Sequence, residues 1–265
     1  MNGRVLIVAG SDSGGGAGIQ ADIKTVTMLG AFAMTAITAL TAQNTEGVFG
    51  VLPIDPAFIR QQMEVVLDDI GADAIKTGML HDAAVIETVA TVLEERAPNL
   101  PLVLDPVMVA KGGAPLIQTD AIETLKHRLA PRAAVLTPNL PEAEILSGRV
   151  IGDLAAMREA ARELLGLGCR AVLLKGGHLP GDVVHDLLAT ASGIREWQSR
   201  RIDSRHTHGT GCTLASAIAA GLAQGMAVEA AVERAREYVQ RAIAAAPGFG
   251  RGHGPLDHAH PLRAI

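Results

Sequence analysis

The sequence predicts an α/β domain of three layers, in which a mostly parallel central sheet carries helices on both faces. Short apolar runs rich in β-branched residues alternate with amphipathic stretches almost from end to end, a pattern typical of parallel strands joined by helices. The 265 residues show no change of composition, no Pro/Ser-rich linker and no internal repeat. We therefore expect a single domain over residues 1–265, with an irregular Gly/His-rich tail over residues 248–265.

The expected strands are short apolar runs, most of which lead into glycine or polar residues. Two later runs, Val183–Leu188 and Arg195–Ile202, are expected to form an antiparallel edge. The expected parallel strands are Val5–Ala9, Phe32–Ala39, Ala74–Lys76, Leu102–Leu104, Ala134–Leu136 and Ala171–Leu174.

The expected helices fill the gaps between these strands. One of them shows the boundary signals clearly, because Asp55 can cap it, Pro56 suits its first turn and Gly71 ends its pattern. The others are Ile19–Leu29, Asp82–Arg96, Thr119–Leu129, Asp153–Leu167, Thr213–Gln224 and Val228–Ala245.

Composition excludes several classes of function. Hydrophobic residues make up 48% of the chain, enough for a sizeable core without disulfides. Aromatic residues make up 2%, the formal net charge is -5 and runs of Lys or Arg are absent, so we expect neither a nucleic-acid binder nor a membrane-surface binder. The two cysteines favour a reducing compartment. The apolar run Val5–Ala9 is too short for a signal peptide or a membrane span, and we expect a cytoplasmic protein.

Polar or glycine-rich residues follow each expected parallel strand. Ligands of open α/β sheets bind beyond the carboxyl ends of the strands, so these loops should converge on one rim. Their convergence predicts a ligand site there. The loops are Gly10–Gly18, Thr41–Gly47, Lys76–Leu80, Asp105–Met108, Thr137–Glu144 and Lys175–His178.

The first two loops suggest a site for a small heterocycle. The Gly10–Gly18 loop matches neither the phosphate-binding P-loop nor the GxGxxG motif, but its three consecutive glycines are more than a tight turn requires and favour close approach of a ligand. Gln43, expected at the end of the second strand, suits the edge of a heterocycle because its amide both donates and accepts hydrogen bonds. Asn44 is explained equally well as a turn residue.

Asp105, Glu142 and Lys175 predict a site for phosphate and magnesium. Mg²⁺ prefers carboxylates and water together with the phosphates of a substrate, and a lysine beside glycines can neutralise phosphate as a compact charge. Ordinary structural roles remain open. Asn139 and Glu142 also fit a helix start, where Asn caps and Glu favours the helix dipole, and Lys175 also fits a solvated strand end.

Residues Gly209, Thr210, Gly211 and Cys212 enter a helix of small residues. The first amides of a helix and its dipole favour anions, such as a phosphoryl group in transfer. Cys212 is then placed to accept a hydroxyl proton, and we expect the helix N-terminus to lower its thiol pKa. The alternative is a small buried hydrophobe at a helix start, which is the interpretation we give Cys169.

Five histidines lie near this loop or in the tail. Their spacing fits no closed structural zinc site, and we expect them to be solvated or to support other residues. They are His206, His208, His253, His258 and His260.

Seven stretches together resemble the hydroxymethylpyrimidine/phosphomethylpyrimidine kinases of thiamine biosynthesis, a ribokinase-like family. The resemblance runs in the same order from residue 5 to about residue 260. The stretches are "GSDSGGGAGIQAD", "ALTAQNTEGV", "KTGML", "LDPVM", "TPNLPEAEIL", "LLKGGH" and "HGTGCTLASAIAAGLAQG".

The resemblance implies ATP-dependent phosphorylation of 4-amino-5-hydroxymethyl-2-methylpyrimidine and then of its monophosphate. It places Gln43 on the pyrimidine, with Gly10, Ala17, Asp22 and Met79 lining the pocket. It assigns Asp105 and Glu142 to magnesium and phosphate, Lys175 and Asn139 to the ATP phosphates, and Gly209–Cys212 to the anion hole. Thr41 stands where the family resemblance leads us to expect an aliphatic residue.

Two other functions remain open at this point. A cysteine-type pyridoxal kinase shares most of these motifs. A non-catalytic pyrimidine-sensing module is the other, although we would expect it to have lost Cys212, Lys175 or Glu142, and all three are present. We expect ATP, Mg²⁺ and a small pyrimidine as ligands, and a homodimer.

Overall fold

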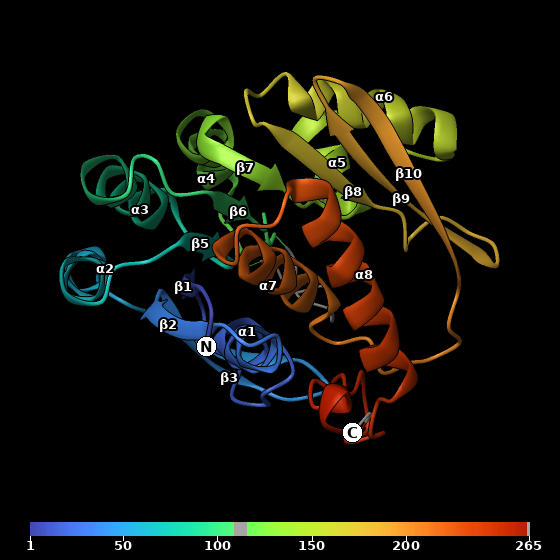
Figure 1. Cartoon of the computed structure of the whole chain (residues 1–265), viewed down its shortest axis with the longest axis horizontal. Helices are drawn as coiled ribbons and strands as arrows, with labels where there is room; N and C mark the ends of the chain where they lie inside the picture. The colour runs from blue at the N-terminus through green and yellow to red at the C-terminus, as the bar shows by residue number, and fades with distance from the viewer. Residues whose placement is uncertain (109–115, 264–265) are drawn as a thin grey trace.

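The computed structural model describes residues 1–108 and 116–263, and Figure 1 shows how they are arranged around a central sheet. In these residues the sheet has eight strands in the order β10-β9-β8-β7-β6-β5-β1-β2. Neighbours from β2 to β8 pair in parallel, whereas β9 and β10 add an antiparallel edge. The predicted fold class and the predicted antiparallel edge are confirmed. The strands are β1 Arg4–Ala9, β2 Phe32–Ile37, β5 Ala74–Thr77, β6 Leu102–Leu104, β7 Ala133–Leu136, β8 Ala171–Lys175, β9 Val183–Thr190 and β10 Gly193–Arg200.

Helices cover both faces of the sheet. On one face lie α1 (Gly18–Met28), α7 (Thr210–Ala223) and α8 (Val228–Ala244). The other face carries α2 (Pro56–Asp69), α3 (Ala83–Arg96), α4 (Thr119–Thr124), its π-helical continuation η1 (Leu125–Leu129), α5 (Leu140–Ser147) and α6 (Leu154–Leu165). A short 3-10 turn, η2 (Ala130–Arg132), joins η1 to β7.

The strand β1 shows why both faces must be covered. Val5 and Ile7 pack into the hydrophobic cluster with α7, while Leu6 and Val8 pack into the cluster on the opposite face. Successive side chains of a strand point to opposite faces, so a strand that is apolar at every position buries apolar area on both. Each such side chain stabilises the fold by about 1.5–3 kcal/mol when fully buried.

The prediction of a second strand over Phe32–Ala39 was wrong at its end. The strand β2 stops at Ile37, and the hydroxyl of the next residue, Thr38, donates to the Met79 carbonyl at 2.6 Å. A separate antiparallel hairpin follows, formed by β3 (Ala39–Gln43) and β4 (Val48–Pro53). Gln43 therefore ends a hairpin strand, not a strand of the central sheet.

One helix prediction needed correction, and a predicted helix start is confirmed. The helix expected from Thr213 begins at Thr210, so Cys212 lies inside its first turn. The helix α5 was predicted only as a helix start at Asn139, and it runs for eight residues before Gly148 ends it in the left-handed conformation.

The described part of the tail folds back onto the start of α7. Pro255 pairs with His208 in an isolated parallel bridge, and the short 3-10 helix η3 (His260–Arg263) follows. The last two residues of the expected tail lie outside the described residues. Across residues 1–108 and 116–263, no helix has the length and apolar character needed to span a membrane.

Candidate active site

A cavity of about 1130 Å³ lies where the carboxyl ends of the parallel strands meet. All of the predicted loops contribute to its lining, which confirms the convergence on one rim. Of the predicted site residues, the lining includes Gly10, Ala17, Gln43, Met79, Asp105, Asn139, Glu142, Lys175 and Gly209 to Cys212.

The loop before α7 is shaped by close backbone contact with the glycine-rich loop after β1. Gly209 adopts a left-handed conformation with φ of 81° immediately before the helix. A Cβ atom at Gly209 would overlap the carbonyl of Gly16, so this approach requires glycine. The first N–H groups of α7 have no acceptor within the helix, and they border the cavity. We call Gly209–Cys212 the anion loop.

Three charged groups lie together opposite the anion loop. The Lys175 ammonium is 3.3 Å from Oδ1 of Asp105, and it would be 3.3 Å from a Cβ atom at Gly211. Burial would lower the pKa of Lys175, but Asp105 and Glu142 outweigh it and raise that pKa. Lys175 is therefore a fixed positive charge beside the helix N-terminus.

Glu142 has a structural role and an unusual charge state. It forms a capping box with Asn139, in which each side chain accepts the backbone N–H of the other at 2.8 and 2.9 Å. The predicted helix-start role is therefore real. Burial and the negative charge of Asp105 raise the pKa of Glu142 to about 7, against the opposing effect of Lys175.

The carboxylates of Asp105 and Glu142 suit a hard divalent cation. Asp105 is 2% exposed and Glu142 is 6% exposed. No group of three or more His, Cys, Asp or Glu residues able to hold a metal occurs within residues 1–108 and 116–263. This donor set fits Mg²⁺, which commonly binds through one or two carboxylates and completes its shell with water and substrate phosphate.

The prediction of a lowered thiol pKa for Cys212 was wrong. Burial, together with the nearby Asp22 and Asp105, raises the pKa of Cys212 to about 12, against the opposing effect of the Lys76 ammonium. Burial disfavours the thiolate more than the Lys76 charge favours it. In the absence of ligands Cys212 is a neutral thiol.

A buried ion pair lies beneath Cys212. The Lys76 ammonium contacts both carboxylate oxygens of Asp22 at 2.8 and 2.9 Å, and Ser216 donates to Asp22 at 2.7 Å. Lys76 and Asp22 are both fully buried. Asp22 was predicted to line the substrate pocket, but it is not among the lining residues and reaches the cavity only through Lys76, which is.

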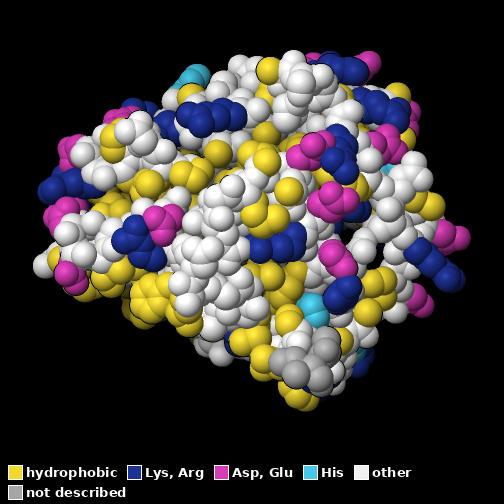
Figure 2. Space-filling view, viewed as in Figure 1, with side chains coloured by type: hydrophobic (Ala, Val, Ile, Leu, Met, Phe, Trp, Pro, Cys, Tyr) yellow, Lys and Arg dark blue, Asp and Glu magenta, His cyan; other side chains and the backbone are white. Residues whose placement is uncertain are grey.

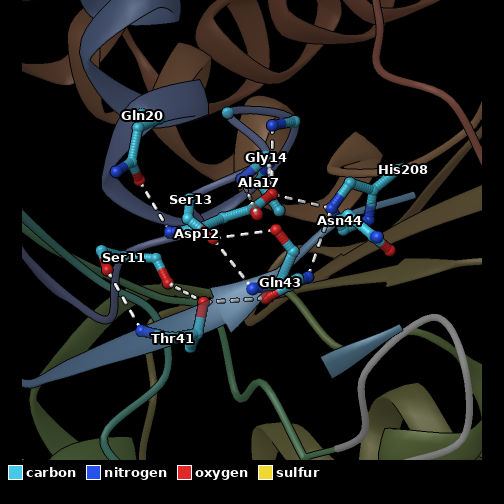
Figure 3. A network of polar contacts seen from close by, with 12 residues as sticks. Ser11, Asp12, Ser13, Gly14, Ala17, Gln20, Thr41, Gln43, Asn44 and His208 are labelled. Carbon is cyan, nitrogen blue, oxygen red and sulfur yellow. Dashed lines mark hydrogen bonds and ion pairs between the residues drawn. The ribbon is translucent and has the colours of Figure 1, made fainter. Parts of the chain in front are cut away.

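The glycine-rich loop and the β3 strand are joined by a polar network (Figure 3). Asp12 accepts hydrogen bonds from the backbone N–H groups of Gly14, Gly16 and Ala17, and one of its oxygens lies 2.8 Å from Nε2 of His208. Burial alone would raise the pKa of Asp12, but these hydrogen bonds, that of His208 foremost, lower it. Asp12 thus ties the glycine-rich loop to the residue before the anion loop.

Comparison with known proteins identifies the family. A model of the family described as phosphomethylpyrimidine kinase matches residues 12–257. The chain belongs to the phosphomethylpyrimidine kinase family. It is 48% identical to the hydroxymethylpyrimidine/phosphomethylpyrimidine kinase of Bacillus subtilis over 256 residues, which are 96% of this chain and 94% of that one. It is 55% identical to the thiamine biosynthesis bifunctional protein ThiED of Geobacter sulfurreducens over 257 residues, 97% of this chain but only 52% of that protein.

Solved structures place this kinase in the ribokinase-like fold. An ADP complex of Bacillus subtilis pyridoxal kinase superimposes with a TM-score of 0.92 at 38% identity, covering 100% of both chains. The phosphomethylpyrimidine kinase of Clostridium difficile superimposes with a TM-score of 0.80 at 40% identity, covering 91% of this chain and 99% of that one.

The sequence did not predict two parts of the kinase's cavity. The sequence placed Asp12 in the glycine-rich loop and His208 beside the anion loop. It did not predict that the two contact each other, because they lie 196 positions apart in the chain. The other part is a wall formed by the segment after β10 and by α8. Its residues include Arg201, Ile202, Ser204, Val239 and Ile243. The spacing of Val239 and Ile243 on one helix face is the signal that could have indicated it.

The remaining cysteine, Cys169, and one tail histidine, His258, are buried and have structural roles. Cys169 is 5% exposed and packs in the core, as predicted. His258 is buried, with Nε2 3.0 Å from the hydroxyl of Thr213 in α7. Burial lowers the pKa of His258 to about 4, so it is neutral at physiological pH. His258 is not solvated; it supports the first turn of α7 after Cys212.

Proposed function

We propose that this kinase transfers a phosphoryl group from ATP to the hydroxyl of 4-amino-5-hydroxymethyl-2-methylpyrimidine, and then to its monophosphate, in thiamine biosynthesis. One observation carries the proposal. A single cavity holds the anion loop, Lys175 and two carboxylates on one side and the amide of Gln43 on another, in a chain of the phosphomethylpyrimidine kinase family. We further propose that the whole chain acts as one domain in the cytoplasm.

The charged side of the cavity suits phosphoryl transfer. Negative charge on the transferring group is stabilised by fixed donors and cations, and positioning supplies most of the catalysis. Lys175 and the N–H groups of the anion loop are such donors, and Asn139 borders the same space. Asp105 and Glu142 would hold Mg²⁺. Bound there, the ion would neutralise phosphate charge and offset the Asp105 charge that raises the pKa of Cys212.

Cys212 is the proposed acceptor of the substrate hydroxyl proton. Its side chain borders the cavity in the first turn of α7. Because its pKa is raised to about 12 without ligands, the thiol becomes a base only when added positive charge favours the thiolate. Lys76 already favours the thiolate from below, so the added charge must come with the bound ligands. The backbone N–H groups of the anion loop act without any change of protonation.

Gln43, Gly10, Ala17 and Met79 form the proposed pyrimidine site. They border the cavity on the side of the glycine-rich loop. The Gln43 amide can donate to a ring nitrogen and accept from an amino group.

Pyridoxal is the second candidate substrate, because the fold superimposes closely on a pyridoxal kinase. One experiment separates the candidates. ADP release is measured with the pyrimidine alcohol, its monophosphate and pyridoxal in parallel, at equal concentrations. We expect turnover with the first two and a much lower kcat/KM with pyridoxal. Phosphorylation of pyridoxal alone would replace the proposal.

The surface of the hairpin supports the proposed homodimer. Phe49 is 72% exposed and Leu52 is 62% exposed, both on β4. Within the described residues β4 pairs only with β3, so its other edge is open, and open apolar edges commonly bind another chain. Figure 2 shows further hydrophobic side chains on the side of the molecule that carries α2 and β2, where Phe58 and Phe32 are exposed.

A further inference from the structure

The side-chain amide of Gln43 lies between two polar neighbours. In the structure Oε1 lies 3.2 Å from the hydroxyl of Thr41, and Nε2 lies 3.4 Å from Nε2 of His208. Figure 3 shows both contacts, together with those that Asp12 makes with His208 and that Ser11 makes with Thr41. The oxygen and nitrogen of an amide have nearly the same shape, so the protons of the neighbours determine which end faces which.

The His208 end requires an acceptor. Asp12 accepts three backbone N–H groups, and hydrogen bonds hold its pKa low, so it is an ionised acceptor. Nε2 of His208, 2.8 Å from Asp12, must then carry a hydrogen. An amide NH₂ group facing that N–H would place two donors against each other, whereas the amide oxygen can share the hydrogen.

The Thr41 end requires a donor. The Thr41 hydroxyl is 2.9 Å from the Ser11 carbonyl, which can only accept, so its single hydrogen belongs there. What remains toward Gln43 is an acceptor lone pair. An amide NH₂ group satisfies it, whereas the amide oxygen would face another oxygen with no hydrogen between them.

We propose that Thr41, together with the Asp12–His208 pair, fixes the Gln43 amide with its NH₂ group toward Thr41 and its oxygen toward His208, so that oxygen and nitrogen are exchanged relative to Figure 3. Gln43 then offers the cavity one donor and one acceptor in a fixed order. A ring edge that fits must carry an acceptor on the Thr41 side and a donor on the His208 side. This inference rests on the proposed placement of the ring at Gln43 and deepens it.

The order of the two groups agrees with the position of the reactive end. His208 directly precedes the anion loop, so the acceptor end of the amide lies on the side where the phosphoryl group would arrive. In the proposed substrate, the 4-amino donor is attached next to the carbon that carries the hydroxymethyl group, and the ring nitrogen acceptor lies beyond it. Thr41 and His208 are thus positioning residues for substrate specificity.

A reversed ring edge tests the inference. The 4-oxo analogue of the pyrimidine alcohol carries an N–H donor where the amino compound has its ring acceptor, and a carbonyl acceptor where it has the amino group. Dissociation constants of both compounds are measured by calorimetry with the full chain and without ATP. The unmodified chain should prefer the amino compound by roughly a hundredfold, because the reversed edge leaves two polar pairs mismatched.

Thr41→Val removes the lone pair and keeps the shape. We expect the preference for the amino compound to shrink by roughly fivefold, the effect of one lost hydrogen bond, and Thr41→Ser to restore it. Thr25→Val is the matched control, because Thr25 is a buried threonine of α1 whose hydroxyl donates to Ala21 and does not contact Gln43. It should leave the preference unchanged.

The outcomes separate this inference from the proposed ring site. Gln43→Leu should weaken binding of the amino compound. If it does, and Thr41→Val weakens both compounds equally, Thr41 only packs and the inference fails alone. If Gln43→Leu changes neither affinity, the ring does not bind there, and the placement and the inference fail together. Equal affinity of the unmodified chain for the two compounds also overturns the inference.

Discussion

Two side chains that line the cavity, Cys212 and Glu142, have raised pKa values, but the shift affects the charge of each differently. Cys212 is kept neutral by burial and by surrounding carboxylates, whereas Glu142, with a pKa of about 7, changes its charge within the physiological range. Burial is the largest cause in both cases, because a charge removed from water needs a compensating partner. Ligands that bring positive charge should therefore ionise both groups.

Replacing Cys212 tests the proposed proton acceptor while it leaves the backbone N–H groups of the anion loop in place. In Cys212→Ser the N–H groups remain but the side chain is a far weaker acid, so kcat should fall by roughly 10²–10⁴-fold while ATP and pyrimidine still bind. Cys212→Asp should recover part of the activity. Its carboxyl would share the burial and the neighbours Asp22 and Asp105, so its pKa would be raised and kcat should increase with pH. Steady-state kinetics across pH 6–9 check this. Near-native turnover of the serine variant would leave catalysis to the backbone alone.

Glu142→Gln tests two effects of the Glu142 carboxyl: its role in the proposed magnesium site and its influence on the stability of the fold. The amide oxygen can still accept the Asn139 N–H, so the capping box survives. The folded-state pKa of Glu142, about 7, exceeds the value of about 4.3 expected when unfolded. Wild-type stability is therefore lost as pH rises from about 4 to 7, and the variant avoids this loss. We expect its Tm to exceed that of the wild type at pH 8 and to match it near pH 4, with turnover strongly reduced.

Magnesium titration of the same variant provides the second measurement. A cation that binds the ionised form of Glu142 should bind the wild type more tightly as pH rises through 7, and this dependence should disappear in Glu142→Gln. Glu144→Gln is the matched control on the same helix, since Glu144 bonds the Ile151 N–H outside the cavity. Magnesium affinity that is independent of pH in the wild type would argue against Glu142 as a ligand.

The shape of the cavity depends on how closely the loop after β1 approaches the start of α7. Gly209 lies against Gly16, and Asp12 holds His208. The loops meet through backbone atoms, so little side-chain adjustment is available to absorb a change there.

Gly209→Ala should separate turnover from general destabilisation. Alanine in the left-handed conformation costs about 1–2 kcal/mol, and its Cβ would also displace the Gly16 carbonyl. Gly225→Ala is the control, because Gly225 has the same φ of 81° and open space around the added atom. Both variants should lose stability in urea unfolding, but only Gly209→Ala should lose most of its kcat. Equal kinetics in the two variants would show that the contact has no catalytic importance.

The sequence predicted the central sheet well, because strands such as β1 are apolar over most of their length, here Val5–Ala9, and bounded by glycine. It missed the β3–β4 hairpin after β2, where Thr38 contacts Met79, 41 residues away, through a hydrogen bond that no local pattern records. The same limit applies to the site. Loop positions placed Lys175, Asp105 and the anion loop at the cavity. The pKa of Cys212 depends on the burial and charges that Lys76, Asp22 and Asp105 create only in the folded chain.

In the whole molecule, the exposed hairpin would connect the proposed dimer to the proposed pyrimidine site. Gln43 ends β3, and β4 beside it exposes Phe49 and Leu52. A second chain against this edge would hold the strand that carries the amide proposed to bind the ring.

Phe49→Ser with Leu52→Ser should convert the proposed dimer to a monomer. Sedimentation at micromolar concentration should give twice the chain mass, 27.5 kDa, for the wild type and the chain mass for the double variant. The variant should also show a raised KM for the pyrimidine. Val150→Ser, a change at an 83% exposed apolar residue after α5, should leave the dimer intact. A wild-type monomer in the same experiment would contradict the assembly.

The start of α7 is supported by residues of the tail, which are among the last to be synthesised. His208 receives its backbone partner from Gly254, and Thr213 receives its side-chain partner from His258. Both partners are synthesised after α8, about 45 residues later than the groups they support, at ribosomal rates of roughly 5–20 residues per second. The sheet can form while the chain is still being extended, but the start of α7, where we propose that phosphate binds, must wait for the tail to emerge. A nascent chain arrested before residue 254 should hence be folded at its centre and incompetent at its active site.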